Sequence, residues 1–574
     1  MDKVEPWRRR LLRTALYGNN VDRSVKARAR LGLAVLAFAA IYAMIATRLV
    51  MFAIAPDGQN ARRYIAQDAI ATARPDIVDR NGEILATDVK LPSLYAEPHR
   101  IIDQDETIEL LTAVLPDFDA AELRERLGSK RRFVWLRREI TAKQQQEIHR
   151  LGLPGIGFLR ENKRVYPSGP AVSHVIGHVN IDNQGIAGIE KWLDGRGLAD
   201  LHTAGFATDR LQNTIELAVD LRVQHALRDE LLIARDKFKA NAAAGIVSDV
   251  RTGEIVAMVS VPDYDPNNPR EALDPTRINR LTTGVYELGS TFKALTIAMA
   301  LDTGKSTLAS SYDARMPLRY GRFNVSDYHA QKRVLTVPEI FTYSSNIGTA
   351  RMALGVGVEH HKWFLRKLGQ LDRLRTELPE SADPLVPKRW AELNTVTIAF
   401  GHGLSVAPLQ AVMGIGALVY GGTLIPPTFL KRSEDEAAAL ATRVIKPDTS
   451  EKMRYLMRLN AEKGTATRAD VKGYYVGGKT GTSEKVVGGR YSKTKLLTSF
   501  TAVLPADNPR YLLLIMLDEP QPTAQTNGYA TSGWNAAPTS AAVIARIAPL
   551  LHIEPRFDLP PAERLILAAA KESR

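Results

Sequence analysis

Three short segments, far apart in the chain, carry side chains that could together transfer an acyl group through a serine. Ser290 and Lys293 stand three residues apart at the start of a long apolar run. Ser344 and Asn346 belong to a Ser-Ser-Asn triplet, and Lys479 begins a Lys-Thr-Gly triplet. Serine enzymes that form acyl intermediates carry S-x-x-K, S-x-N and K-T-G in this order. Each element alone is weak evidence, but together they predict one active site.

Each of these residue types suits a separate step of such a reaction. A serine hydroxyl is a poor nucleophile until a base removes its proton, and on a helix Lys293 would share a face with Ser290. Burial and a nearby cation lower the pKa of a lysine, and we expect Lys479 to be that cation. We expect Ser344 to relay the proton to the leaving amine, and Asn346 to hold the Lys293 amine and a substrate amide. Which group acts as the base is disputed for such enzymes, so the sequence leaves that assignment open.

The residues that follow Lys479 are predicted to bind the substrate. The backbone N–H groups of Ser290 and Thr482 would stabilise the developing oxyanion. Gly481 would let its strand approach a ligand closely. The predicted substrate-binding residues are therefore Thr480, Gly481 and Thr482, and this chemistry requires no cofactor and no metal. A second S-x-x-K, Ser492–Lys495, is expected in a loop between strands.

The third triplet also supports a competing hypothesis, nucleotide binding. Residues 473–480, GYYVGGKT, match the phosphate-loop pattern G-x-x-x-x-G-K-[ST]. A phosphate loop follows a buried strand and opens a helix. Here the preceding residues are polar, the interior residues Tyr474, Tyr475 and Val476 favour a strand, and a glycine follows. A phosphate-loop nucleotide-binding protein therefore remains a distant alternative.

Length and composition exclude several other classes. The chain has 574 residues, which predicts two or three domains, and no cysteine, which excludes disulfides, zinc–thiolate sites and cysteine nucleophiles. Of the net charge of +13, residues 1–30 contribute +6, with nine Lys/Arg against three Asp/Glu. Because nearly half of the basic excess lies in this short tail and the other 544 residues share +7, nucleic acid is not an expected partner. His360-His361 is a weak metal signal, and we expect it at the surface.

A long apolar run follows the basic tail. Residues 31–55 match the ~20 residues of a membrane span. The run is longer than the apolar region of a signal peptide, and no clear small-residue cleavage site follows. Its positive N-terminal flank places the N-terminus in the cytoplasm. The sequence predicts a cytoplasmic tail at 1–30, a single transmembrane helix at 31–55, and the remainder outside.

The remaining sequence divides into two parts that differ in their predicted secondary structure. Residues 56–220 predict an elongated pedestal of modest core, with a hairpin at Asn81-Gly82. In residues 221–560, strands come first, helices follow and strands return, which predicts an α+β domain with one antiparallel sheet built from both ends. Residues 561–574 are predicted to form a C-terminal tail. Four pedestal charges are candidates for internal or partner salt bridges: Arg74, Arg80, Arg164 and Glu190.

These motifs, with RPDIVDRNGEILA, RVYPSG, HVIGHVNIDNQGIAGIEKWLD and FGHGLSVAPLQ, resemble those of the class B penicillin-binding proteins, and in particular the cell-division (FtsI-like) members. The resemblance implies a pedestal and a transpeptidase domain of the serine β-lactamase-like fold. It implies peptidoglycan D,D-transpeptidase activity on stem peptides ending in D-Ala-D-Ala, and covalent inhibition by β-lactams. It further implies a single-pass protein of the bacterial inner membrane at the division septum, with its catalytic domain in the periplasm. The implied protein partners are a polytopic, FtsW-like glycosyltransferase and other division proteins.

Departures from related patterns separate this chain from its neighbours. Leu288 stands where many relatives have proline, which alters the entry to the helix and leaves the chemical groups intact. Trp390 holds the place of the deacylating glutamate of class A β-lactamases, so a β-lactam adduct should persist. An elongation-type transpeptidase and a D,D-carboxypeptidase remain alternatives. A scaffold without activity is disfavoured because all the motif residues are intact.

Overall fold

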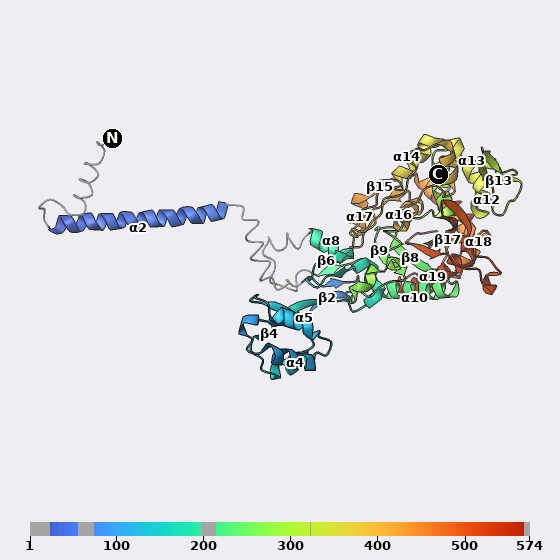
Figure 1. Ribbon diagram of the computed structural model, residues 1–574. Coiled ribbons are helices and arrows are strands. Elements are labelled where there is room, and N and C mark those ends of the chain that lie inside the picture. Colours follow the sequence, from blue (N-terminus) through green and yellow to red (C-terminus); the bar gives the residue numbers. More distant parts are fainter. Residues whose placement is uncertain (1–22, 55–73, 197–213, 322, 567–574) are drawn as a thin grey trace. The chain divides into compact units, whose positions relative to one another are not determined.

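The computed structural model describes residues 23–54, 74–196, 214–321 and 323–566 (Figure 1). The chain forms two units, Met1–Ile70 and Ala71–Arg574. The described part of the first unit is the helix α2 (Arg23–Ile54). Its window Arg30–Arg48 has a mean hydropathy of 1.8, and none of it is buried. Within the described ranges, α2 is the one helix long and apolar enough to cross a membrane, and it lies where the span is predicted.

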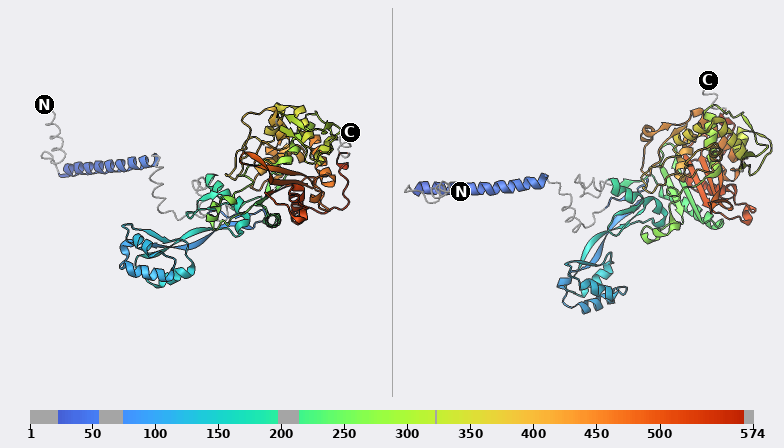
Figure 2. Two further views of the ribbon diagram at one scale, coloured as in Figure 1. Left: turned by 45° about the vertical axis from the view of Figure 1, so that its right-hand side comes forward. Right: turned by 45° about the horizontal axis from the view of Figure 1, so that its top comes forward.

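The second unit begins with a long two-stranded ladder. Strands β2 (Ile84–Ala96) and β4 (Ile156–Val165) pair antiparallel at ten positions, a length of about 30 Å. Figure 2 shows these strands leading to a group of helices. We call this group the head; it spans residues 94–158 and has its own apolar core, which includes Leu94, Leu111 and Leu136. Its elements are α4 (Gln104–Val114), α5 (Ala120–Leu127), β3 (Val134–Arg137) and α6 (Ala142–Arg150).

The other end of the ladder belongs to a second group, which we call the base. Strand β1 (Ile77–Val78) pairs antiparallel with β2 across the predicted Asn81-Gly82 turn, and parallel with β7 (Ile215–Glu216). Base residues Ile77 and Tyr166 share one buried apolar cluster with residues of the next domain, such as Leu295. The base and that domain therefore have a common core. Its other elements are α7 (Ser173–Ile176), β5 (His178–Val179), β6 (Gly185–Ala187) and α8 (Gly188–Arg196).

The pedestal charges singled out in the sequence pair within the chain. Arg74 and Arg164 are both buried, and each donates to the buried carboxylate of Glu190 at 2.7 Å. Arg80 reaches Glu254 of the next domain at 2.9 Å. Such charges are tolerated in a core because each is paired and hydrogen-bonded. All four charges therefore have partners within the chain. Arg74, Arg164 and Glu190 hold the base together.

A five-stranded antiparallel sheet forms the centre of the next domain, in the order β16-β17-β18-β8-β9. As predicted, strands from the two ends of the domain meet, since β18 pairs with β8. Alternate residues of β18 face opposite sides: Leu512 and Leu514 lie in one apolar cluster, and Leu513 and Ile515 in another. The strands are β8 (Ala242–Asp249), β9 (Ile255–Val261), β16 (Gly477–Val487), β17 (Arg490–Leu504) and β18 (Tyr511–Asp518).

Helices cover both faces of this sheet. One face packs against α10 (Leu221–Lys237) and α19 (Ala536–Leu550). The other face packs against the apolar α11 (Lys293–Asp302) and α16 (Pro408–Val419), together with further helices (Figure 1). These are α12 (Val337–Thr342), α13 (Asn346–Val356), α14 (Val358–Lys367), α15 (Glu392–Ala399) and α18 (Pro447–Lys463). The short helix α17 (Glu434–Leu440) contributes no residue to this apolar cluster.

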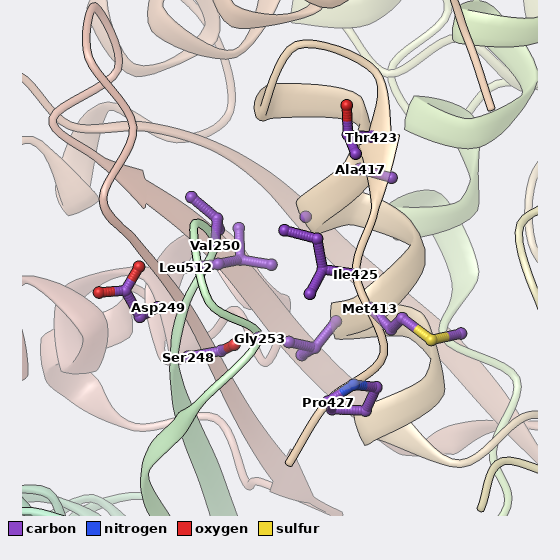
Figure 3. A pocket seen from close by; sticks show the side chains of 12 residues that line it. Ser248, Asp249, Val250, Gly253, Met413, Ala417, Thr423, Ile425, Pro427 and Leu512 are labelled. Carbon is purple, nitrogen blue, oxygen red and sulfur yellow. The ribbon is translucent and has the colours of Figure 1, made fainter. Parts of the chain in front are cut away.

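Three short strand pairs and a small cavity complete the domain. The pairs are β10 (Ser311–Asp313) with β13 (Val334–Thr336), β11 (Leu318–Tyr320) with β12 (Phe323–Val325), and β14 (Thr423–Leu424) with β15 (Thr442–Arg443). The cavity, of ≈ 20 Å³, is lined by Val250, Met413, Ile425 and Leu512 (Figure 3). It has room for about one water molecule, so it is not a substrate site.

Two local predictions are wrong. The second S-x-x-K, Ser492–Lys495, lies within strand β17 rather than in a loop. His361 is fully buried on α14 rather than at the surface, and burial lowers its pKa to about 3. The first error arose because an exposed, polar stretch of a strand resembles a loop in sequence, and the second because a polar residue in a core resembles a surface residue.

The predicted tails lie largely outside the described residues. These are residues 567–574 of the C-terminal tail and residues 1–22 of the N-terminal one. The remaining C-terminal residues, 561–566, belong to the domain. Ala562 is buried, and Glu563 pairs with Lys463 at 2.8 Å.

Candidate active site

Ser290 lies in a tight turn that packs between two other segments. The turn is a 3-10 helix, Gly289–Phe292, and α11 begins only at Lys293. The prediction that Ser290 opens the α-helix is therefore corrected, but a 3-10 helix has 3.0 residues per turn, so Ser290 and Lys293 still share a face. A Cβ on Gly289 would lie 2.5 Å from the carbonyl oxygen of Thr482. A Cβ on Gly401 would lie 1.9 Å from that of Gly289, so both positions require glycine.

Lys293 is fully buried beneath this turn. Its Nζ donates to Ser344 Oγ at 3.0 Å and to the Ser344 carbonyl oxygen. Burial lowers the pKa of Lys293 to about 7, although the charge of Asp327 opposes the change. An amine with this pKa is partly neutral near pH 7, which is the requirement for a base.

Ser344 receives a second amine from the opposite wall. Lys479, also fully buried on β16, donates from Nζ to Ser344 Oγ at 3.0 Å and to the Thr480 carbonyl oxygen at 3.1 Å. The hydroxyl oxygen has two lone pairs and can accept both amines. Ser344 has a φ of 56°, which is uncommon for a residue other than glycine.

The electrostatic role expected for Lys479 is reversed. We expected burial and the charge of Lys479 together to lower the pKa of Lys293, but only burial does so. The pKa of Lys479 is itself lowered well below its ordinary value by burial, and then by the charge of Lys293. Two amines on one oxygen repel each other when both are protonated, so one of the pair is readily neutral.

Asn346 is close to these groups but bonds elsewhere. Its amide Nδ2 donates to the Ser326 carbonyl oxygen at 2.8 Å, whereas we expected it to hold the Lys293 amine. The Lys293 amine is held by Ser344 instead. Asn346 is the first residue of α13, whose N-cap Ser345 accepts from Gly348 N–H at 3.0 Å. The cap fixes where α13 begins, and so where the triplet enters this helix.

Strand β16 forms the opposite wall, at the edge of the sheet. Thr480 Oγ1 shares a hydrogen bond with Thr465 Oγ1 at 2.7 Å, and Thr482 Oγ1 accepts from Ser532 N–H at 3.1 Å. A Cβ on Gly481 would lie 2.4 Å from Thr291 Oγ1. The glycine is thus required by the approach of the nucleophile turn, whereas we had expected the approach of a ligand.

The competing phosphate-loop hypothesis does not fit this geometry. Residues Gly477–Val487 form a strand, and the strand continues into β17 through a hairpin rather than into a helix. Lys479 is buried and bonded to Ser344. A phosphate loop would need backbone N–H groups at a helix N-terminus.

Comparisons with known proteins cover most of this chain. The penicillin-binding protein transpeptidase domain matches residues 243–543, and the penicillin-binding protein dimerisation domain matches residues 69–194. The probable peptidoglycan D,D-transpeptidase FtsI of Caulobacter vibrioides is 41% identical over 497 residues, 85% of this chain and 83% of the relative. The chain belongs to the penicillin-binding protein transpeptidase family.

More distant members of the penicillin-binding protein family also match over most of their length. Peptidoglycan D,D-transpeptidase FtsI of Escherichia coli K12 is 29% identical over 536 residues, 88% of each chain. The crystal structure of penicillin-binding protein 3 from Mycobacterium tuberculosis, complexed with aztreonam, aligns with a TM-score of 0.64 at 23% identity. It covers 86% of this chain and 98% of that chain, so the two share a fold.

Two groups at the site of this penicillin-binding protein were missed in the sequence. Asp327 accepts from Ser345 Oγ at 2.7 Å and from Ile347 N–H at 3.0 Å, and it is the charge that opposes the low pKa of Lys293. No motif marks it. His402 belongs to the FGHG segment, to which we had assigned no role; burial, and then the charge of Lys293, lower its pKa to about 4.

Proposed function

We propose that this chain is a peptidoglycan D,D-transpeptidase that cross-links stem peptides through an acyl-enzyme on Ser290. The observation that carries the proposal is the convergence of two buried lysines on Ser344, beside the nucleophile turn. That arrangement supplies a partly neutral amine near a serine hydroxyl, together with a path for its proton. The FtsI relatives support the substrate, which is the D-Ala-D-Ala end of a stem peptide.

The first half of the proposed reaction forms the acyl-enzyme. Lys293 takes the proton of Ser290 as the oxygen attacks the carbonyl carbon of the first D-Ala. The N–H groups of Ser290 and Thr482 stabilise the oxyanion. Ser344, held by Lys293 and Lys479, passes the proton to the nitrogen of the departing D-alanine.

The second half of the reaction reverses these transfers. An amine of a neighbouring stem peptide loses a proton to the same relay and attacks the ester carbonyl, which frees Ser290. Thr480, Gly481 and Asn346 would align the peptide along the edge of β16, since an edge strand offers unpaired backbone groups. β-Lactams would acylate Ser290 in the same way and remain attached.

We also propose the cellular setting. Residues 1–30 lie in the cytoplasm, 31–55 span the inner membrane, and the pedestal (56–220) and transpeptidase domain (221–560) lie in the periplasm at the division septum. The positive flank before the span and the FtsI relatives support this orientation and site. The proposed partners are a polytopic, FtsW-like glycosyltransferase and other division proteins.

Intact-mass measurement of the full chain treated with a penicillin tests the proposal. Wild type should gain the mass of one penicillin, and Ser290→Ala should gain none. No adduct on wild type, or an equal adduct on the mutant, would contradict the proposal. Incubation with a stem-peptide ester and a D-amino acid then separates transfer from hydrolysis, because a carboxypeptidase would yield mainly the hydrolysed peptide.

A further inference from the structure

Glu287 lies three residues before Ser290 and bonds to three different segments. Its Oε1 accepts from the backbone N–H of Gly403 at 2.8 Å and from the hydroxyl of Tyr491 at 3.1 Å. Its backbone carbonyl accepts from Ser483 Oγ at 2.5 Å. Ser483 is the next residue after Thr482, whose N–H is assigned to the oxyanion. One residue therefore joins the nucleophile turn to β16, to the 401–404 loop and to the β16–β17 hairpin.

The carboxylate of Glu287 sits in an unfavourable place. It is largely buried, and burial raises its pKa. Its Oε2 is buried and has no hydrogen-bond partner among the described residues. A buried carboxylate oxygen without a partner costs free energy. The bonds from Gly403 and Tyr491 to Oε1 are therefore what holds the carboxylate in this position.

The packing around the Ser290 turn makes the position of Ser290 depend on the hydrogen bonds of Glu287. The N–H of Gly289 donates to the Gly401 carbonyl oxygen at 3.2 Å, and the two glycines are in close contact. The turn also touches Thr482 on its other side. A small shift of the 401–404 loop or of β16 would therefore be transmitted directly to Ser290.

Tyr491 belongs to the outer part of the hairpin, where Lys485 also forms ion pairs with Asp518 at 2.7 Å and Glu519 at 2.8 Å. Strand β18 pairs with β17 only at Leu497–Leu504. Beyond it, residues 484–495, which we call the arm, pair only between β16 and β17, with a register shift at Glu484/Lys485. The ring of Tyr491 lies 5.5 Å from that of His402, and its hydroxyl reaches Glu287. Tyr491 thus fastens the arm to the rim of the site.

We propose that Glu287 is a positioning residue for acyl transfer. It fixes the Ser290 turn against the 401–404 loop and β16, and through Tyr491 it couples the arm to that geometry. This inference rests on the proposed function, because the geometry it maintains is that of the acyl-enzyme reaction. Glu287 acts through Gly403 and Ser483 and does not itself touch the reacting atoms.

Acylation kinetics of the full chain in detergent, with a fluorescent penicillin, test the role of the carboxylate. Glu287→Ala should lower the saturating acylation rate constant roughly 10- to 100-fold, the usual effect of losing a hydrogen bond to a charged group. Glu287→Gln keeps an oxygen for Gly403 N–H and should stay within about threefold of wild type. Glu359→Ala, at an exposed glutamate on α14, is the matched control.

Rates are compared only for the fraction of protein that becomes labelled, so partial misfolding does not alter them. A saturating rate of Glu287→Ala equal to wild type, or a Glu287→Gln rate as low as that of Glu287→Ala, overturns the proposal. If Glu287→Ala does not fold, Glu287→Asp replaces it, since its shorter side chain cannot reach both donors, and the same loss is expected. If wild type itself is not labelled, the proposed function fails instead.

Hydrogen exchange tests the coupling to the arm. Tyr491→Phe keeps the ring on His402 and removes the hydroxyl, so amides of residues 484–495 should exchange faster than in wild type. The penicillin concentration that gives half the maximal rate should rise. Unchanged exchange in the arm would overturn the coupling.

Discussion

The pH dependence of acylation should report the protonation of Lys293. The neutral amine is the form that can accept the Ser290 proton, so the saturating acylation rate should rise as Lys293 loses its proton. Lys293 is fully buried, and burial lowers its pKa to about 7 from an ordinary value of 10.5. The inflection is therefore expected near neutral pH.

The size of the effect follows from simple titration. With a pKa of about 7, the neutral fraction is about one tenth at pH 6 and about nine tenths at pH 8. The rate should rise about tenfold between these values and then level off. A lysine with its ordinary pKa would give about a hundredfold rise over the same interval, and the rise would continue to about pH 10.

A substitution near Lys293 supplies the matched test. The charge of Asp327 favours the protonated amine, so Asp327→Asn should move the inflection to lower pH. The asparagine oxygen can still accept from Ile347 N–H, which keeps the local fold. The assay is stopped-flow acylation of the full chain by a fluorescent penicillin from pH 5.5 to 9, with tryptophan fluorescence as a control for unfolding.

Two results would refute the reasoning. A rate that keeps rising in proportion to hydroxide beyond pH 8 would mean that Lys293 is not the titrating base. An inflection that moves to higher pH in Asp327→Asn would mean that the Asp327 charge does not act on the titrating group.

Three further predictions concern substitutions of Glu190, Gly401 and Lys293. Glu190→Ala should lower the free energy of unfolding by about 3–5 kcal/mol, because it leaves buried Arg74 and Arg164 without their shared carboxylate; an unchanged thermal midpoint would contradict this. Gly401→Ala should abolish penicillin labelling because its Cβ would meet the Gly289 carbonyl, whereas Gly421→Ala, also at positive φ but in open space, should retain labelling. Lys293→Met should abolish labelling and raise the free energy of unfolding by about 2–4 kcal/mol at pH 7. Between pH 7 and 10.5 the unfolded wild-type chain binds more protons than the folded chain, so wild type becomes more stable as the pH rises. Denaturation should therefore show the difference in unfolding free energy between Lys293→Met and wild type shrinking towards pH 10.5.

Most of the fold could be predicted because its signals are local. The apolar runs of β18 and α11 and the Asn81-Gly82 turn are each encoded in a few consecutive residues. The three motifs could be placed in one site because their residue types have few other uses in this order. The antiparallel sheet followed from the order of its elements.

The features that were missed depend on contacts between distant segments. The approach of Gly401 to Gly289 joins positions 112 residues apart, and nothing near either residue indicates it. The low pKa of Lys293 was predicted from burial and from the charge of Lys479, but a sequence does not show which of the two acts, and burial alone does. Asp327 is one aspartate among many until α13 is seen to begin beside it.

The separate apolar core of the head has a consequence for how the chain can be shortened. The head is attached through β2 and β4 and has its own interior, so excision of its outer residues with closure of the two strands should leave a soluble domain. The base cannot be excised in this way. A chain that starts at Leu221 would lose Ile77, Leu85 and Tyr166 from the shared interior and expose the apolar side chains that they cover. The head is thus an exchangeable module, whereas the base is a permanent part of the catalytic domain.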